Sequence, residues 1–366
     1  MLHLIASLDA TGSHEVDRFV DVARTAERGL LDAVFVDDGL ALPVRPDAGL
    51  ADGLEPLTLL AAVASATEHI GLIATLSTTF YEPYLLARSL ASLDHISHGR
   101  AGWNIGTGGD LDEAANFHLD EPVEDAVRYE RAAELLDVVT QLWDSWADDA
   151  VARHGAVDPR RIREIEHTGL FFKVRGPLNV RRMPQGWPLL TQQAGPSADE
   201  AEFAARYAET VFTTHRDVGT AAAYAREVKS RASAYGREPH LPLILPRLVP
   251  VVGAVGGSVG SVGSVGTSPR SPLVVAGPPE HIADVMQEWS EAGAADGFLV
   301  HPSAIPGGLA TFVNQVVPVL QRRGLFRTEY DGATLRERFA LPRPEDHFPA
   351  FDPLPRPDFI PTLAVA

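Results

Sequence analysis

The feature that most constrains the fold is an alternation of short apolar runs with longer segments of helical period. Eight runs have the length of buried strands: Leu2–Leu8, Ala33–Val36, Ile70–Leu76, Ala101–Thr107, Pro188–Gln192, Thr210–Thr213, Leu241–Val252 and Gly297–Val300. Strands that alternate with helices form parallel sheets. Eight such units in a chain of 366 residues favour a closed (β/α)8 TIM barrel over an open doubly wound sheet.

The segments between these runs carry apolar stripes at helical spacing. One stripe is Val16, Phe19, Ala23, Ala26 and Leu30, and Gly29 marks its C-terminal end. The clearest stripe is Tyr129, Ala132, Leu136, Val139, Trp143 and Trp146. Both predict helices that pack on the barrel, with Tyr129 as the one position whose side chain could serve a site instead.

Two segments depart from the alternation. Residues 148–187 contain many turn formers and predict an insertion, with a hairpin, between the fourth helix and the fifth strand. Residues 253–272 repeat Gly-Ser-Val and predict a flexible loop after the seventh strand. We therefore expect residues 1–340 to form a single barrel and residues 341–366 to form a C-terminal tail.

Composition excludes several function classes. The chain has 31 basic and 49 acidic residues, and a net charge of -18 argues against nucleic acid and anionic membranes as partners. It has no cysteine, which excludes thiol catalysis and cysteine-ligated metals, and it has no H-E-x-x-H motif, so no metal site is expected. No apolar run reaches the roughly 18 residues of a membrane helix. The N-terminus lacks the basic start of a signal peptide, so we expect a cytoplasmic protein.

In TIM barrels the chemistry collects where strands end and βα loops begin. The second strand ends in Asp37 and Asp38, and Asp38 either caps a helix or faces the barrel mouth. The third strand ends in hydroxyl residues that include Thr75. Asn104, in the fourth strand RAGWNIGTGGD, is a buried amide that either bonds a neighbouring strand or meets a polar ring.

Two further places are candidates for the same mouth: the start of the helix after the fifth strand, and the first βα loop. Ser197 and Glu200 follow the fifth strand and have the spacing of a helix N-terminus, which either is simply capped or also binds an anion. His14 lies in the first βα loop and would face the mouth, although a single histidine is usually not catalytic.

Long ordered stretches of the chain support a family resemblance. The stretches ATLSTTFYEPYLLARSLASLDHISHGRAGWNIGT, RYERAAELLDVVTQLWDSWADDA and FFKVRGPLNVRRMPQGWPLLTQQAGPS resemble the flavin-dependent monooxygenases of the bacterial luciferase-like superfamily. Within it, the chain is most similar to the branch of nitrilotriacetate, dibenzothiophene-sulfone and pristinamycin monooxygenases. The resemblance covers most of residues 1–340.

The resemblance implies a (β/α)8 barrel that binds FMN, reduced by a separate NAD(P)H:flavin reductase, and that assembles as a homo-oligomer. Reduced FMN and O2 would form a C4a-(hydro)peroxyflavin that oxygenates a small organic substrate. Carried over by motif, Asp38, Thr75 and Asn104 line the flavin ring pocket. In the same way, Tyr129, Ala194, Gly195 and Ser197 hold the phosphate, and His14 lies near the reacting face as the catalytic candidate.

The chain departs from the family pattern at several of these places. Asp125 stands where a histidine is common, Pro196 has no N–H to donate, and Gly108 stands where a hydroxyl is usual. Ser13 replaces the first histidine of a pair. Two alternatives therefore stay open: an oxidoreductase that uses the deazaflavin F420, and a non-catalytic flavin-binding barrel.

Overall fold

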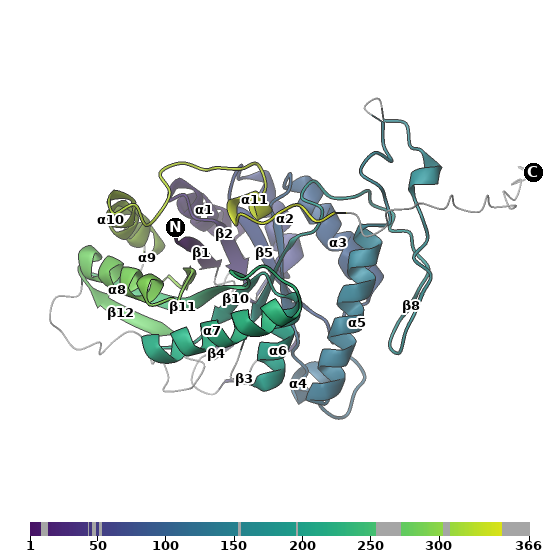
Figure 1. The fold of residues 1–366 in the computed structure, drawn as a ribbon, viewed down its shortest axis with the longest axis horizontal. Coiled ribbons are helices and arrows are strands. Elements are labelled where there is room, and N and C mark those ends of the chain that lie inside the picture. Colours follow the sequence, from purple (N-terminus) through teal and green to yellow (C-terminus); the bar gives the residue numbers. More distant parts are fainter. Residues whose placement is uncertain are drawn as a thin grey trace, which may run out of the picture.

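The computed structural model describes residues 1–8, 14–42, 44–45, 49–50, 53–152, 155–194, 197–253, 272–302 and 308–345. Parallel strands close into a ring (Figure 1), and they are β1 (His3–Leu8), β2 (Ala33–Val36), β5 (Gly71–Ser77), β6 (Ala101–Gly106), β9 (Leu189–Gln193), β10 (Thr210–Thr213), β11 (Leu243–Val252) and β13 (Gly297–Val300). Each strand pairs with the next, and β13 pairs with β1. The predicted TIM barrel is confirmed.

A further strand, β12 (Leu273–Gly277), was not predicted. It pairs in parallel with Leu248–Val252, the last residues of β11, and thus lies outside the ring. At ten residues, β11 is longer than its neighbours in the ring, so its upper half offers a free edge. The pairing depends on this tertiary edge, which a run of five residues does not reveal by itself.

Helices cover the outside of the ring (Figure 1). The longer ones are α1 (Val16–Arg28), α2 (Pro56–Ser65), α3 (Pro83–Ile96), α5 (Asp125–Trp143), α6 (Ala198–Tyr207), α7 (Val218–Ala234) and α8 (Pro279–Glu291). The last unit joins α9 (Gly308–Thr311), a π-helical turn (Phe312–Val316) and α10 (Val317–Arg322). Short elements are β3 (Val44–Arg45), β4 (Gly49–Leu50), α4 (Leu111–Ala115), a 3-10 turn (Pro159–Arg161) and α11 (Leu335–Arg338).

Most of each predicted apolar stripe is buried, but in the first stripe Val16 is exposed and Leu30 lies beyond the helix. In α1 the residues Phe19, Ala23 and Ala26 are buried, and Gly29 is the C-cap. In α5 the stripe ends at Trp143, so Trp146 lies beyond the helix and not on it as predicted. Its indole N–H donates to the Leu178 carbonyl at 2.7 Å, which fixes the start of the segment that follows.

That segment, between α5 and β9, contains the predicted hairpin. Its antiparallel strands are β7 (His167–Thr168) and β8 (Lys173–Val174). Figure 1 shows the segment standing out from the barrel beside α5. Glu134 of α5 holds the hairpin turn, because its carboxylate accepts the backbone N–H groups of Leu170, Phe171 and Phe172 at 2.9–3.0 Å.

The lower end of the ring, where the strands begin, is filled by the C-terminal part of the chain. Inward side chains of the barrel, among them Ile5, Ile73 and Leu243, form one cluster with Leu335 and Phe339. The Phe339 ring stacks on His3 of β1 at 4.4 Å. Ligands therefore have to use the opposite mouth, where the strands end.

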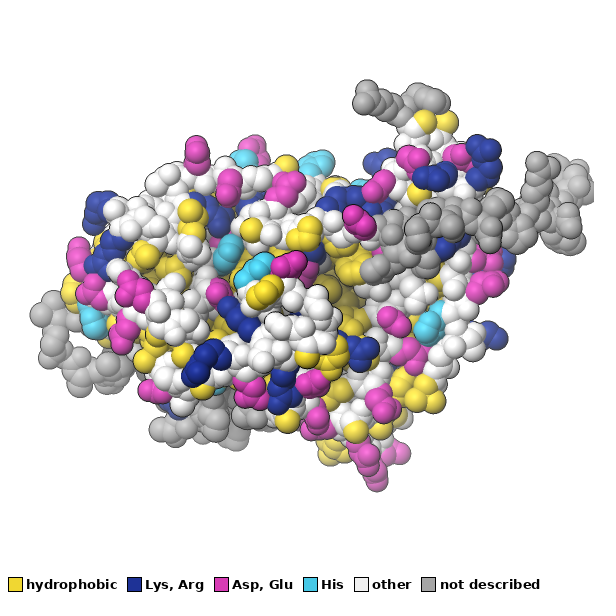
Figure 2. All heavy atoms as spheres, viewed as in Figure 1, with side chains coloured by type: hydrophobic (Ala, Val, Ile, Leu, Met, Phe, Trp, Pro, Cys, Tyr) yellow, Lys and Arg dark blue, Asp and Glu magenta, His cyan; other side chains and the backbone are white. Residues whose placement is uncertain are grey.

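Some predictions fall on residues that the structure does not describe. Residues 254–271 of the Gly-Ser-Val loop and residues 346–366 of the tail lie outside the described part, so the domain limits stay predictions. In the described chain no helix is long and apolar enough to cross a membrane. Figure 2 shows acidic and basic side chains interspersed over the visible face, without a single dominant patch.

Candidate functional site

The upper mouth is polar because the strand alternation places charged residues one step above the apolar core. Successive residues of a strand point to opposite faces. Phe35 of β2 and Leu245 of β11 point into the barrel core, so Asp37 and Arg247 take the next inward positions. Gln193 does the same at the end of β9.

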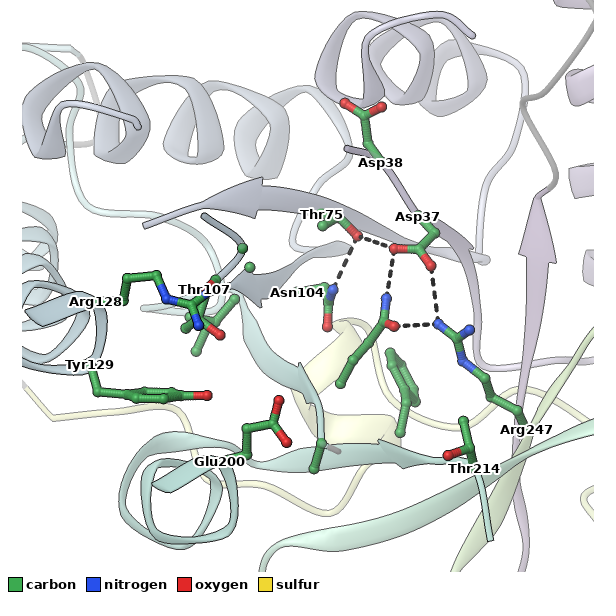
Figure 3. A pocket seen from close by; sticks show the side chains of 16 residues that line it. Asp37, Asp38, Thr75, Asn104, Thr107, Arg128, Tyr129, Glu200, Thr214 and Arg247 are labelled. Carbon is green, nitrogen blue, oxygen red and sulfur yellow. Dashed lines mark hydrogen bonds and ion pairs between the residues drawn. The ribbon is translucent and has the colours of Figure 1, made fainter. Parts of the chain in front are cut away.

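These side chains surround a cavity of about 370 Å³ (Figure 3). The lining residues are Asp37, Asp38, Thr75, Asn104, Ile105, Gly106, Thr107, Gly108, Arg128, Tyr129, Gln193, Ala194, Glu200, Phe212, Thr214 and Arg247. The volume lies within the range of roughly 300–1,000 Å³ that is typical of small-molecule sites. The structure thus gathers Asp38, Thr75, Asn104, Tyr129 and Ala194 at one pocket.

One end of the pocket is built on an ion pair. Arg247 Nη2 lies 3.0 Å from the Asp37 carboxylate and also donates to the Gln193 amide oxygen. Gln193 Nε2 in turn donates to Asp37 at 2.6 Å. The three side chains close a triangle (Figure 3), which fixes the amide of Gln193 and neutralises Asp37.

The floor beside this triangle is made by Asn104 and its neighbours. Asn104 is 2% exposed. Its Nδ2 donates to the Thr75 hydroxyl at 3.0 Å, and its Oδ1 accepts from the Thr191 hydroxyl at 3.3 Å. Thr75 donates to the Val36 carbonyl at 2.9 Å. Asn104 is therefore both a core amide, bonded to two neighbouring strands, and a lining residue of the pocket.

Asp38 turns away from Asp37 (Figure 3), toward a smaller hollow of about 60 Å³ that Tyr81 and Glu113 also line. It does not cap α2, whose N-cap is Glu55. Removal from water raises the pKa of Asp38 to about 6, and the carboxylates of Glu55, Asp37 and Glu113 add to this effect. Asp38 thus carries a carboxyl group that titrates near neutral pH at the edge of the pocket.

The other end of the pocket holds Arg128 and Tyr129 from the first turns of α5. Arg128 donates to the Thr107 carbonyl at 2.7 Å and pairs with Asp125. Its stem crosses the backbone of Gly109, where an added Cβ would lie 2.6 Å from the arginine Cδ. The glycines after the fourth strand thus allow a side chain to pass close to the backbone. Removal from water raises the pKa of Tyr129.

Beside Tyr129 lies the N-terminus of α6. Ser197 is its N-cap and forms the predicted capping box with Glu200. Ala194 is buried and lines the pocket, as does Glu200, whereas Ser197 is exposed and is not among the lining residues. Gly195, the remaining member of the predicted phosphate turn, lies outside the described residues.

His14 is exposed and lies just before α1. It is not among the lining residues of the pocket, and its neighbours 9–13 are not described. Within the described ranges, no three or more Asp, Glu, His or Cys side chains are grouped in a way that could hold a metal ion.

The sequence interpretation did not select Asp37, Gln193, Arg247 or Arg128, and it named Glu200 only as part of a helix N-terminus and not as a lining residue. Asp37, Gln193 and Arg247 could have been found from the two-residue alternation of a strand, because each continues the inward-facing positions of an apolar strand. Arg128 and Glu200 lie instead on the first turns of helices, whose rotation about the barrel only the tertiary structure defines.

The pocket suits a long ligand with a polar heterocycle at one end. The amides of Asn104 and Gln193, next to Asp37 and Thr75, offer donors and acceptors to a ring edge. Gly106 follows Asn104 at the next inward position, so no side chain fills the space above the floor. Arginine and a helix N-terminus at the other end are groups that bind phosphate.

Comparisons with known proteins identify the family of the chain. A family model described as luciferase-like monooxygenase matches residues 1–254. The chain is 36% identical to the N-acetyl-S-(2-succino)cysteine monooxygenase of Bacillus subtilis (strain 168), over 92% of either chain. It is 37% identical to component A of the nitrilotriacetate monooxygenase of Aminobacter aminovorans, over 91% of either chain.

A solved structure extends the similarity to the fold. The riboflavin lyase RcaE, determined with modified FMN and its substrate riboflavin, superposes with a TM-score of 0.84 at 26% identity. The superposition covers 92% of this chain and 95% of that one.

Proposed function

The chain belongs to the luciferase-like monooxygenase family, a family of flavin-dependent monooxygenases, and from this premise we propose that it is the oxygenase of a two-component system. In this proposal it takes reduced FMN from a separate reductase and uses O2 to oxygenate a small organic substrate. The observation that carries the proposal is the two-ended pocket, with the Asp37, Gln193 and Asn104 amide and carboxylate groups at one end and Arg128 at the other.

In this assignment the flavin ring lies over Asn104, Thr75 and the Asp37–Gln193–Arg247 triangle. The phosphate end lies toward Tyr129 and the N-terminus of α6, and Ala194, Gly195 and Ser197 remain the proposed phosphate-binding residues. Bound reduced flavin supplies the electrons that activate O2. Asp38 adds a carboxyl group of raised pKa at the pocket edge, in a position to hold or release a proton near the ring.

The protein's own contribution is binding, orientation and exclusion of water. His14 remains our candidate for a catalytic residue near the reacting face, on the strength of its place in the first βα loop. A flavin reductase is the proposed partner, since one relative is named as component A of its enzyme. A homo-oligomer is proposed on the family resemblance.

The test is rapid mixing of the protein and anaerobically reduced FMN with oxygenated buffer. The absorbance of oxidised flavin is followed with time. We expect it to return at least about tenfold more slowly than for free FMN, because the pocket shields the ring from water. Two variants, Asn104→Leu and Arg247→Met, are measured in parallel, and each removes one polar side chain from the ring end of the pocket. A return at the rate of free FMN in the wild-type protein would contradict the proposal.

A further inference from the structure

Glu200 brings a carboxylate into the phosphate end of the pocket. It is the third residue of α6, it is half-buried, and it lines the cavity together with Arg128 and Tyr129. Figure 3 shows its carboxylate directed into the cavity, on the side of the Tyr129 hydroxyl. A group of this charge lies where the proposed ligand carries its own negative charge.

The charges at this end do not compensate for it. Arg128 is the cation that lines this end, and it is already paired with Asp125 and bonded to the Thr107 carbonyl. Arg128, Asp125 and Glu200 together leave one negative charge in excess. The positive charge at this end is therefore already paired within the protein when a phosphate binds.

The helix N-terminus is also partly occupied. The Ser197 N–H donates to the Glu200 carboxylate at 3.3 Å, and the Glu200 N–H donates to the Ser197 hydroxyl at 3.1 Å. Helix N-termini bind anions through such N–H groups. Here two of them serve the capping box, so the Ser197 N–H is available to a ligand only if the Glu200 side chain moves, and the Glu200 N–H only if the Ser197 side chain moves. The residue that precedes Ser197 in the sequence is Pro196, which has no N–H to donate.

The charge of Glu200 also reaches Tyr129. Removal from water is the largest cause of the raised pKa of Tyr129, and the negative charge of Glu200 adds to it. The negative charge of Glu200 acts on the Tyr129 hydroxyl, so it would also act on an anion bound beside that hydroxyl.

We infer that Glu200 is a specificity-determining residue, which weakens the binding of phosphorylated flavin and leaves the binding of riboflavin unchanged. The inference rests on the proposed function, because the assignment of the phosphate to this end belongs to that proposal. A phosphate monoester carries about −1.5 to −2 charges at neutral pH, whereas riboflavin ends in an uncharged hydroxyl. The same pocket thus discriminates by the charge of the ribityl end and not by the ring.

The test is a titration of FMN and of riboflavin, each followed by flavin fluorescence, into the wild-type protein and two variants. Glu200→Gln removes the charge and keeps the capping box, since glutamine serves at this position as well as glutamate. Asp199→Asn is the matched control: it removes the same charge from the adjacent residue, which is exposed and is not among the lining residues. Thermal unfolding of each variant verifies that the fold is retained.

We expect Glu200→Gln to lower the Kd of FMN about tenfold, which corresponds to about 1.4 kcal/mol, and to change the Kd of riboflavin less than about twofold. Asp199→Asn should change neither by more than about twofold. Equal tightening of both flavins, or equal effects of the two variants, would overturn the inference. If both flavins bind and Glu200→Gln leaves their ratio unchanged, the inference fails and the proposed function stands. If neither flavin binds to any of the three proteins, both fail.

Discussion

Asp37 and Arg247 meet across the barrel mouth at 3.0 Å, although 210 residues separate them in the chain. One extends β2 and the other lies within β11, so the pair joins two strands that are not neighbours in the ring. The side chains are 45% and 17% exposed, which makes the pair more a device for orienting Gln193 than a source of stability.

Arg247→Met should therefore separate binding from folding. We expect the flavin Kd to rise about tenfold, because Asp37 loses its counter-ion and Gln193 its fixed orientation. The free energy of unfolding should fall by no more than about 1 kcal/mol. Fluorescence titration and urea unfolding measure the two quantities. Arg323→Met, which breaks the exposed pair with Asp284, is the control and should leave flavin binding unchanged.

Asn104→Leu should reduce both flavin binding and the free energy of unfolding. The substitution leaves the hydroxyls of Thr75 and Thr191 without their amide partner in a buried setting. We expect a loss of roughly 1–3 kcal/mol of unfolding free energy, together with weaker flavin binding. Asn116→Leu, at an exposed amide that donates to the Leu40 carbonyl, should cost less than about 1 kcal/mol. Equal losses from the two substitutions would show that the Asn104 amide has no special role.

Asp38 should make stability depend on pH. Its pKa in the folded chain is about 6, above the ordinary value of 3.8, so the folded state holds this proton more tightly than the unfolded state. The stabilisation of the folded state by this bound proton is therefore complete below pH 3.8 and is lost as the pH rises through about 6. Asp38→Asn should be more stable than the wild type at pH 8, by about 0.5–1 kcal/mol after allowance for solvent screening, and equal to it near pH 3.5.

Thermal melts of both proteins across that pH range measure the difference. A constant offset between the two proteins at every pH would mean that the substitution acts through shape and not through the carboxyl charge.

Arg336 should be important for folding. It is 4% exposed and pairs with Glu209, which is 12% exposed, beneath the barrel. Arg336→Met leaves that carboxylate without its partner, and we expect a loss of about 3–5 kcal/mol of unfolding free energy. Arg160→Met breaks the exposed pair with Asp158 and should leave the free energy of unfolding nearly unchanged. Comparable losses in urea unfolding would contradict this reading of burial.

The sequence predicted the barrel because its strands are continuous apolar runs, and this pattern does not depend on neighbours. Thr75 and Asn104 were found for the same reason, since they lie within such runs, whereas Ala194 was named only through the family resemblance. The sequence did not show which of Asp37 and Asp38 points into the barrel. The answer depends on whether Phe35 faces inward, and hence on the pairing of β2. Glu200 was placed correctly in a capping box, but its position in the pocket depends on how α6 packs against Tyr129 and could not be predicted from the sequence.

The Leu335–Phe339 segment beneath the barrel has a kinetic consequence. With the lower mouth filled by the chain itself, the flavin, substrate and product of the proposed function would share the upper one. A substrate bound over the ring would block the exit of the flavin below it, so the order of binding would matter. Under the proposed function, flavin exchange with a reductase would then be possible only between turnovers, after the product has left.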